Sequence, residues 1–479
     1  MYSWDFEALD LDQVIKAYDI RGLVDSQLTE DLAYGVGAAF ALFVNGPVGK
    51  GPVGKGPVGS GPEFPQGSES VVIGEDMRPS SPALASAFAQ GVMDQGVDVV
   101  RIGLAATDQL YFASGYLGVP GAMFTASHNP AAYNGIKLCR AGAAPVGKES
   151  GLAQIRETLL GSKPAIASKR GSSRSEDLLP KYAQHLLSLV DLTQMRPLKI
   201  VVDAGNGMGG HTVPTVFASL PISLTPLFFE LDGSFPNHEA NPIEPANMRD
   251  LQSAVKNLGA DIGLAFDGDA DRCFIVDEYG EIVSPSTLTA LIAARELARK
   301  PGATIIHNLI TSRSVKEVVE ESGGRAVRSR VGHSYIKAQM AEEGALFGGE
   351  HSGHFYFADF WNADSGMLAA LHAISALGNA PVGTKLSEVL RPYDRYIASG
   401  EINSTVNESA SKMEKIAAIY GAREGVTVDH LDGITISAGE WWFNVRASNT
   451  EPLLRLNVEA KDRVAMESLR DEVLGVIRS

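Results

Sequence analysis

Three aspartates at alternate positions are the first group in the sequence that suggests chemistry. Asp267, Asp269 and Asp271 lie in the stretch GLAFDGDADRCFIVDE, between two apolar segments. Closely spaced carboxylates repel one another when ionised unless a cation or several hydrogen-bond donors lie between them. Because oxygen-only ligands favour a hard cation over zinc, the pattern predicts a Mg²⁺-binding loop.

A calcium-binding EF-hand loop is the main alternative for this segment. The three acids and Glu278, at the twelfth position, match its pattern. However, Arg272 stands where that loop needs glycine for a sharp turn, and the flanks favour strands rather than helices. A Mg²⁺ loop therefore fits the sequence better.

A serine on a constrained turn is the candidate nucleophile. Ser127 and His128 belong to TASHNP, where Pro130 bars Asn129 from a helical conformation, so the serine is expected on a loop. An ordinary surface turn would use the same residue types. A serine hydrolase is disfavoured because adjacent residues rarely point toward each other and no GxSxG elbow surrounds Ser127.

Two further segments carry groups suited to a phosphorylated sugar. GGEHSGH offers Glu350, Ser352 and His354 to neighbouring sugar hydroxyls. Zinc binding by His351 and His354 is a lesser alternative, because no cysteine or HExxH spacing accompanies them. In RASNTEPLLR, arginine forks, hydroxyls and loop amides predict a phosphate site. Its members are Arg446, Ser448, Asn449, Thr450 and Arg455.

A glycine-rich turn leaves a different class of function open. Gly205, Gly207 and Gly210 have the spacing of a dinucleotide-binding turn, and Glu230 lies near the position of a ribose-binding acid. An NAD-dependent oxidoreductase is therefore an alternative. We favour a tight strand-to-helix turn, which needs the same glycines, because no partner site for hydride transfer is evident downstream.

These loops follow segments that are typical of α/β domains. Strand-like runs end in polar or glycine-rich loops in SVVIGEDMRPSSP, KIVVDAGNGMGG and ATIIHNLITSRS, and helices are expected over residues 83–95 and 315–322. This alternation predicts three α/β units. WWFNVRASNTEPLLRLNVEA predicts two strands around a loop in a smaller fourth domain. A terminal helix should follow, with apolar positions at Met466, Leu469, Val473 and Ile477.

Composition excludes several classes of protein. A chain of 479 residues is too long for one hydrophobic core. A net charge of −16 argues against nucleic acid and anionic membranes as partners. Two cysteines, Cys139 and Cys273, cannot form a disulfide framework and suit a reducing cytosol. Without a recognisable signal sequence or a bilayer-length apolar run, the expected location is cytoplasmic.

Two segments are expected to connect domains or loops rather than to form a core. Residues 46–60 are three copies of a five-residue Gly-Pro-rich unit, for which we expect a flexible loop. Within it, Gly49 to Lys55 imitates a phosphate-binding loop, but Gly56 stands where Ser or Thr must reach Mg²⁺. A linker rich in Lys, Arg and Ser is expected over residues 162–177.

Seven motifs occur along the chain in the order AYDIRG, TASHNP, NGIK, DGDADR, VGHSYIK, GEHSGH and RASNTEP. In their identity and order they resemble the motifs of the α-D-phosphohexomutase superfamily, most closely those of its bacterial phosphomannomutase/phosphoglucomutase branch. The resemblance implies a heart-shaped α/β enzyme, with three related α/β domains and a smaller α+β C-terminal domain around a central cleft. The expected domains are residues 1–165, 176–281, 282–390 and 391–479.

The resemblance also implies a mechanism. Phosphorylated Ser127 would donate its phosphoryl group to a hexose 1-phosphate, giving a bound 1,6-bisphosphate that turns around and returns its other phosphate, so that hexose 6-phosphate leaves. Asp267, Asp269 and Asp271, with an oxygen on Ser127, would hold Mg²⁺. Glucose or mannose 1,6-bisphosphate would serve as activator, GEHSGH as the sugar loop and RASNTEP as the site of the phosphate that does not react.

Other groups are placed near the phosphoserine by the same resemblance: Arg21, His128, Lys137, Arg272 and His333. Lys137 is a candidate general base, which requires a lowered pKa. His333 is the other acid–base or sugar-contact candidate, and His128 would support the serine loop. The pair Glu350 and Ser352 favours glucose and mannose phosphates; a phosphoglucosamine mutase is the alternative within the same chemistry. The expected partners are small sugar phosphates, not nucleic acid or membrane.

Overall fold

The computed structural model describes residues 2–6, 9–46, 70–447 and 453–479. These residues form two compact units that interleave along the chain. The first unit is Met1–Val283 with Ser352–Val389, and the second is Ser284–His351 with Leu390–Ser479. The repeat at residues 47–60 lies outside the described residues.

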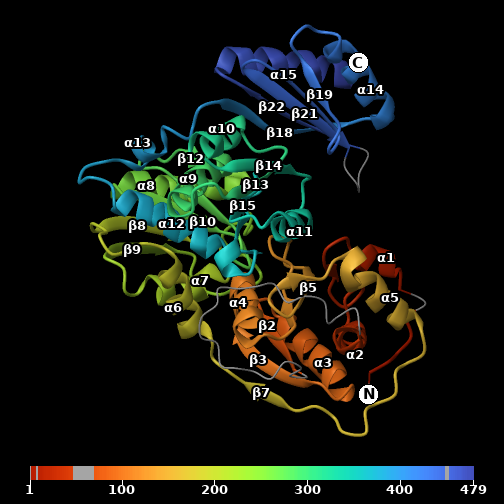
Figure 1. Ribbon diagram of the computed structural model, residues 1–479. Coiled ribbons are helices and arrows are strands. Elements are labelled where there is room, and N and C mark those ends of the chain that lie inside the picture. The colour runs from red at the N-terminus through yellow and green to blue at the C-terminus, as the bar shows by residue number, and fades with distance from the viewer. Residues whose placement is uncertain (1, 7–8, 47–69, 448–452) are drawn as a thin grey trace. The chain divides into compact units, whose positions relative to one another are not determined.

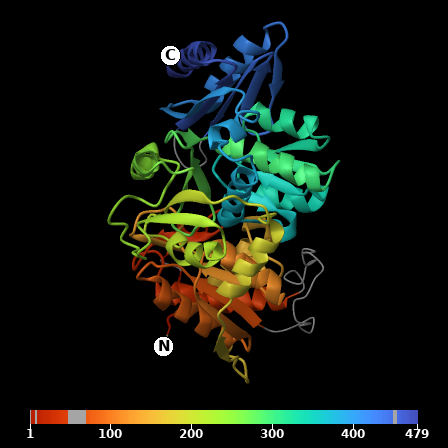
Figure 2. The same ribbon diagram turned by 90° about the vertical axis from the view of Figure 1, so that its left-hand side faces the viewer.

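The first unit opens with a seven-stranded sheet in the order β1-β5-β4-β2-β3-β7, with β6 paired to β5. Helices lie on this sheet in Figures 1 and 2, where its strands run from red at β1 to yellow at β7. Phe40 and Phe88 on two helices pack with Phe124 of a strand in one buried core. The strands are β1 (Ile20–Leu23), β2 (Ser70–Glu75), β3 (Asp98–Leu104), β4 (Gly121–Phe124), β5 (Tyr133–Arg140), β6 (Ala144–Pro145) and β7 (Ser173–Ser175), and the helices are α1 (Leu11–Val14), α2 (Glu30–Asn45), α3 (Ser81–Asp94), α4 (Thr107–Leu117) and α5 (Ala153–Leu160).

A second sheet of the first unit has the order β12-β11-β10-β8-β9. Strands β10 and β8 run parallel, whereas β10 and β11 form an antiparallel pair whose connection is the acidic loop. The elements are α6 (Leu179–Leu189), β8 (Leu198–Asp203), α7 (Gly209–Phe217), β9 (Ile222–Leu227), α8 (Arg249–Leu258), β10 (Ile262–Phe266), β11 (Cys273–Val276) and β12 (Ile282–Val283). The later part of this unit adds the antiparallel pair β16 (Phe355–Phe357) and β17 (Ala363–Asp364), followed by α12 (Gly366–Gly378) and α13 (Leu386–Leu390).

The second unit combines a parallel sheet with an antiparallel one. Strand β13 pairs in parallel with both β14 and β15. The elements are α9 (Pro285–Arg299), β13 (Thr304–Asn308), α10 (Arg313–Glu321), β14 (Arg325–Ser329), α11 (His333–Glu343) and β15 (Phe347–Gly349). The expected helix over residues 315–322 is thus α10, which begins two residues earlier because Ser312 caps it.

The antiparallel sheet of the second unit has the order β18-β22-β21-β20-β19. One face is apolar and packs on α14 and α15, which lie over it in Figure 1. The terminal helix buries Met466, Leu469, Val473 and Ile477, as its periodicity predicts. The elements are β18 (Ile397–Thr405), α14 (Ser409–Gly421), β19 (Thr427–Asp429), β20 (Ile434–Ala438), β21 (Trp441–Ala447), β22 (Leu453–Ala460) and α15 (Arg463–Arg478).

Three sequence expectations can be compared with these elements. The strand-like runs become β2, β8 and β13, and the α/β fold class is confirmed. The expected helix over residues 83–95 is α3, which begins at Ser81. The segment 162–177 is more than a linker, because β7 within it adds to the edge of the first sheet beside β3. Among the described residues, no helix is both long and apolar enough to cross a membrane.

Candidate active site

The turn between β4 and β5 holds Ser127 in an unusual backbone conformation. Its φ of 50° lies in the left-handed region, which a residue with a side chain rarely adopts without support. The Oγ1 of Thr125 accepts a hydrogen bond from the Ser127 N–H at 2.9 Å, and the Asn129 N–H bonds the carbonyl of Ala126 at 3.0 Å. Ser127 is therefore held on a constrained loop, as the Asn-Pro signal predicts.

A buried arginine stabilises this turn by binding its backbone carbonyls. Arg78 follows β2, and its guanidinium donates to four backbone carbonyls of the turn and its exit at 2.7 to 3.0 Å. These acceptors are the carbonyls of Ser127, Asn129, Pro130 and Tyr133. Its charge is balanced by Asp76 at 3.3 Å, and its side chain is fully buried. Arg78 could not be predicted from the sequence, because the backbone carbonyls that it binds leave no trace there.

Arg21 of β1 also contacts the serine turn. Its guanidinium donates to the side-chain oxygen of Asn129 and forms an ion pair with Asp19 at 2.5 Å. The structure thus brings Arg21 to the TASHNP loop, which the resemblance predicts.

The serine hydroxyl lies against the acidic loop. Ser127 Oγ donates to Oδ2 of Asp267 at 2.8 Å, and Arg272 forms an ion pair with the same carboxylate at 2.7 Å. A guanidinium nitrogen of Arg272 lies 3.5 Å from the serine oxygen. Burial raises the pKa of Asp267 to about 7, with Asp271 and Asp269 adding to the rise and Arg272 opposing it. A nucleophile-type hydroxyl, a carboxylate and an arginine are therefore within contact distance.

The other two aspartates share a lysine. Lys137 Nζ on β5 lies 2.7 Å from Asp269 and 2.6 Å from Asp271. Burial would lower the pKa of Lys137, but the charges of the two carboxylates outweigh burial and raise it well above its usual value. A general base needs the opposite shift. The structure presents Lys137 as a cation, and its role as a base stays a prediction.

Asp269 has a second partner that was not predicted from the sequence. Thr107, the first residue of α4, donates its hydroxyl to the Asp269 carboxylate at 2.6 Å and its N–H to the Asp269 carbonyl at 2.9 Å. Burial would raise the pKa of Asp269, but Lys137 and Thr107 outweigh it and lower the pKa. The start of α4 therefore fixes the middle of the acidic loop.

The acidic loop has the donor set of a divalent cation site. Asp267, Asp269 and Asp271 are buried, and one oxygen from each lies within 4.8 Å of the others. Oδ1 of Asp269 and Oδ1 of Asp271 are buried and accept no hydrogen bond from the described residues. Buried carboxylate oxygens without donors are costly unless a cation meets them. The residues present therefore fit a hard cation.

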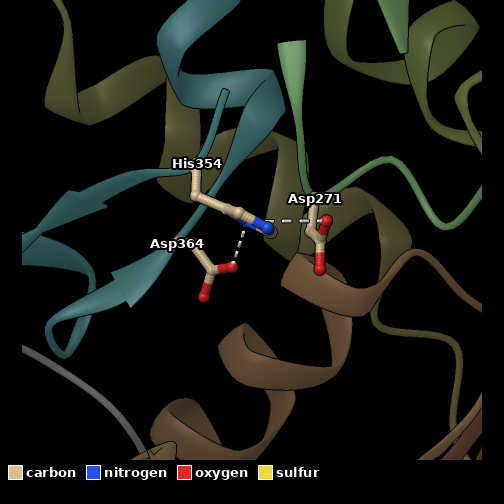
Figure 3. A group of neighbouring side chains, drawn as sticks. All are labelled: Asp271, His354 and Asp364. Atoms are coloured by element: carbon tan, nitrogen blue, oxygen red, sulfur yellow. Dashed lines mark hydrogen bonds and ion pairs between the residues drawn. The ribbon is translucent and has the colours of Figure 1, made fainter. Parts of the chain in front are cut away.

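His354, the residue directly before β16, reaches the acidic loop. Figure 3 shows its imidazole pointing between Asp364 and Asp271, with Nδ1 3.0 Å from one carboxylate and 3.8 Å from the other. Burial would lower the pKa of His354, but Asp271 and Asp364 outweigh it and raise the pKa. We expected His354 among sugar-binding residues; the structure adds that it reaches the acidic loop, and Asp364 is a further residue that we missed.

His128 lies beside the serine without a carboxylate partner for its ring among the contacts described. Its Nδ1 is 3.2 Å from Ser127 Oγ. Burial lowers its pKa to about 2, and Arg272 and Arg21 add to the shift. The lowered pKa favours the neutral ring beside the serine hydroxyl, and the supporting role of His128 stays a prediction.

The glycines that imitate a dinucleotide site have a structural cause. A Cβ on Gly207 would lie 2.6 Å from the carbonyl oxygen of Gly268 in the acidic loop, and a Cβ on Gly210 would lie 2.2 Å from the carbonyl of Phe229. The Met208 N–H also bonds the carbonyl of Gly268 at 2.9 Å. The glycine-rich turn therefore packs against the acidic loop, which accounts for its glycines without a nucleotide.

The remaining predicted binding residues divide between the two units at GEHSGH. In the second unit, Glu350 accepts from Asn308 Nδ2 and from the Gly332 N–H, both at 3.2 Å, and is buried. His351 Nδ1 lies 3.3 Å from Ser286 Oγ. Ser352 begins the return of the chain to the first unit.

Two groups of predicted residues are only partly described. His333 begins α11, which follows the turn that bonds Glu350. Arg446 lies near the C-terminal end of β21, and Arg455 lies on β22. Both arginines form ion pairs with Glu401. Ser448, Asn449 and Thr450 lie outside the described residues.

The chain matches four family models in succession. They are described as phosphoglucomutase/phosphomannomutase alpha/beta/alpha domains I, II and III, over residues 59–163, 180–280 and 284–396, and the C-terminal domain of the same family, over residues 401–476. A protein of Xanthomonas campestris named phosphohexose mutases is 39% identical over 97% of this chain and 98% of its own length. A phosphomannomutase of Vibrio cholerae is 38% identical over 96% of both chains.

Relatives with other names and a solved structure agree with these matches. A phosphoglucomutase of Neisseria meningitidis is 35% identical over 97% of both chains. The crystal structure of a phosphoglucomutase/phosphomannomutase family protein from Burkholderia thailandensis has a TM-score of 0.84, with 31% identity, and covers all of this chain and 98% of its own. The fold is that of a phosphohexomutase. This chain belongs to the phosphoglucomutase/phosphomannomutase family.

Proposed function

We propose that this protein interconverts hexose 1-phosphates and hexose 6-phosphates, with glucose and mannose as the sugars, through a phosphoserine at Ser127. The observation that carries the proposal is the 2.8 Å contact between Ser127 Oγ and Asp267, next to two further buried aspartates. The names of the relatives, phosphomannomutase and phosphoglucomutase, supply the substrate class.

In the first half-reaction, a free sugar hydroxyl attacks the phosphorus on Ser127. The bond from phosphorus to Ser127 Oγ breaks as the new bond to the sugar oxygen forms, and the hydroxyl proton passes to a base. Charge spreads over the equatorial phosphoryl oxygens in such a transfer, so fixed cations stabilise it. Arg272, 3.5 Å from Ser127 Oγ, is placed to supply one.

The acidic loop would hold Mg²⁺ through Asp267, Asp269 and Asp271, with an oxygen on Ser127 completing the set. Bound Mg²⁺ would add positive charge at the phosphoryl oxygens. Arg78 and Arg21 hold the serine turn, so that its hydroxyl stays beside the loop.

In the second half-reaction, the sugar 1,6-bisphosphate presents its other phosphate to Ser127 after turning around. Glu350 and Ser352 would bind sugar hydroxyls, and Arg446 and Arg455 would bind the phosphate that does not react. Glucose or mannose 1,6-bisphosphate would act as activator by phosphorylating Ser127.

The test is the initial rate of 6-phosphate formation from glucose, mannose and glucosamine 1-phosphates, with Mg²⁺ and a trace of glucose 1,6-bisphosphate. Ser127→Ala should remove nearly all turnover, whereas Ser188→Ala, at an exposed serine of α6, should behave as wild type. Full activity of Ser127→Ala would disprove the phosphoserine. A preference for glucosamine 1-phosphate would move the protein to the phosphoglucosamine mutases.

A further inference from the structure

One carboxylate, that of Glu401, forms ion pairs with both arginines that we assign to the phosphate site. Glu401 Oε2 lies 2.8 Å from a terminal nitrogen of Arg446, and Oε1 lies 3.3 Å from one of Arg455. Each carboxylate oxygen therefore has its own guanidinium. Arginine forks bind carboxylate and phosphate with the same donors, so Glu401 and a phosphate would compete for them.

The strand register explains why the three side chains meet. Arg446 on β21 is directly opposite Arg455 on β22. On the other side of β22, Glu401 of β18 is opposite Asn457, two residues beyond Arg455 and so on the same face. Like charges directly opposite each other destabilise an antiparallel pair. Glu401 offsets that repulsion in the protein without ligand.

The charge of Glu401 also acts on the segment predicted to bind the sugar. Burial lowers the pKa of His351, and the charge of Glu401 acts on the same ring in the opposite direction. The electrostatic influence of Glu401 therefore extends to the part of GEHSGH that lies in the second unit.

We propose that Glu401 is an internal competitor that limits how tightly Arg446 and Arg455 hold the phosphate of the substrate. This inference rests on the proposed function, in which these arginines bind the phosphate that does not react. With Glu401 ionised, two positive charges and one negative charge face a phosphate dianion. Removing the negative charge should strengthen phosphate binding.

Limited affinity suits a reaction whose intermediate must turn around. The bisphosphate has to leave the arginines with one phosphate and return to them with the other. Binding that stabilises every bound state equally does not accelerate chemistry, and tight binding of an intermediate slows its reorientation. A carboxylate that re-occupies the arginines as the phosphate leaves would ease that release.

The test is calorimetric titration of the full-length protein with inorganic phosphate and with glucose 6-phosphate. A Ser127→Ala background keeps both titrations free of turnover. Glu401→Gln should lower the dissociation constants of both ligands by about five- to tenfold, in keeping with a partly exposed ion pair. Glu401→Asp, which keeps the charge, should have dissociation constants closer to those of the Ser127→Ala parent protein.

The matched control is Glu440→Gln, which removes an exposed carboxylate paired with Lys461 and leaves the two arginines untouched. Unchanged or weaker binding by Glu401→Gln, in protein that melts cooperatively, would overturn the inference and make Glu401 an anchor of the arginines. If the parent binds inorganic phosphate but not glucose 6-phosphate, the proposed function fails, while the phosphate titration still decides the role of Glu401.

With Ser127 intact, Glu401→Gln should lower KM for glucose 1-phosphate without raising kcat. A lower KM with a raised kcat would also contradict the inference, because release of the intermediate would then not depend on Glu401.

Discussion

The guanidinium of Arg78 donates to the backbone carbonyl of Ser127 at 2.9 Å, so the proposed nucleophile is held through its main chain as well as through the contact of its hydroxyl with Asp267. The same arginine bonds three more carbonyls of the turn. A single buried side chain therefore stabilises the left-handed conformation that points the hydroxyl at Asp267.

Replacing Arg78 should damage both stability and activity. Arg78→Lys offers a point charge instead of a fork and would leave buried carbonyls without donors, beside a buried Asp76. We expect a loss of about 3 to 5 kcal/mol in the free energy of unfolding. Denaturant melts measure it, with Arg174→Lys on exposed β7 as the control. A loss below about 1 kcal/mol would contradict this account of the turn.

The hydroxyl of Thr107 should set the affinity for the metal. Thr107→Val removes the donor to Asp269, whereas Thr107→Ser keeps it. Because Asp269 Oδ2 would then keep only Lys137 as a side-chain donor and be oriented less firmly, we expect the Mg²⁺ concentration for half-maximal rate to rise about tenfold in Thr107→Val, in the range seen when groups that orient metal ligands are lost. Thr107→Ser should remain near wild type. Equal Mg²⁺ dependence in both variants would show that the hydroxyl does not orient Asp269.

A methyl group at residue 268 should separate the serine turn from the acidic loop. A Cβ on Gly268 would lie 2.4 Å from the carbonyl oxygen of Ser127, so one of the two backbones must move. Gly268→Ala is expected to cost about 1 to 3 kcal/mol and to remove most of kcat. Gly475→Ala, in α15 with no atom near its Cβ position, is the control and should not lower stability. Wild-type kcat in Gly268→Ala would rule out this close approach.

The ion pair of His238 and Asp203 should make part of the stability depend on pH. Nε2 of His238 is 3.1 Å from Asp203 Oδ2. Burial would lower the histidine pKa, but the hydrogen bond and charge of Asp203 outweigh it and raise the pKa above 6.5. The stabilisation is therefore complete below about pH 6.5 and is lost as the pH rises through the folded-state pKa.

His238→Gln tests this dependence by denaturant melts from pH 5.5 to 8.5. The stability difference between wild type and variant should be largest at low pH and shrink by about 1 kcal/mol toward high pH. A difference that grows with pH would mean that the histidine is stabilised in its neutral form.

Local patterns were enough to predict the acidic loop and the terminal helix, because spacing alone places Asp267, Asp269 and Asp271 together and Met466 with Val473 on one face. Thr107 and Arg78 could not be predicted in this way. Thr107 meets Asp269 across 162 residues, and Arg78 bonds carbonyls, which every residue has. Strand β7 was missed because Ser-Arg-Ser has no apolar alternation; its pairing with β3 decides its conformation.

The return of the chain to its first unit at Ser352 has a consequence for biosynthesis. Asp364, which holds His354 beside the acidic loop, is translated roughly ninety residues after Asp271. At about 5–20 residues per second, on the order of ten seconds separate the two on the ribosome. During that interval the acidic loop has been synthesised but His354 and Asp364 have not. The ribosome must synthesise β13 to β15 of the second unit before it reaches β16 and β17 of the first.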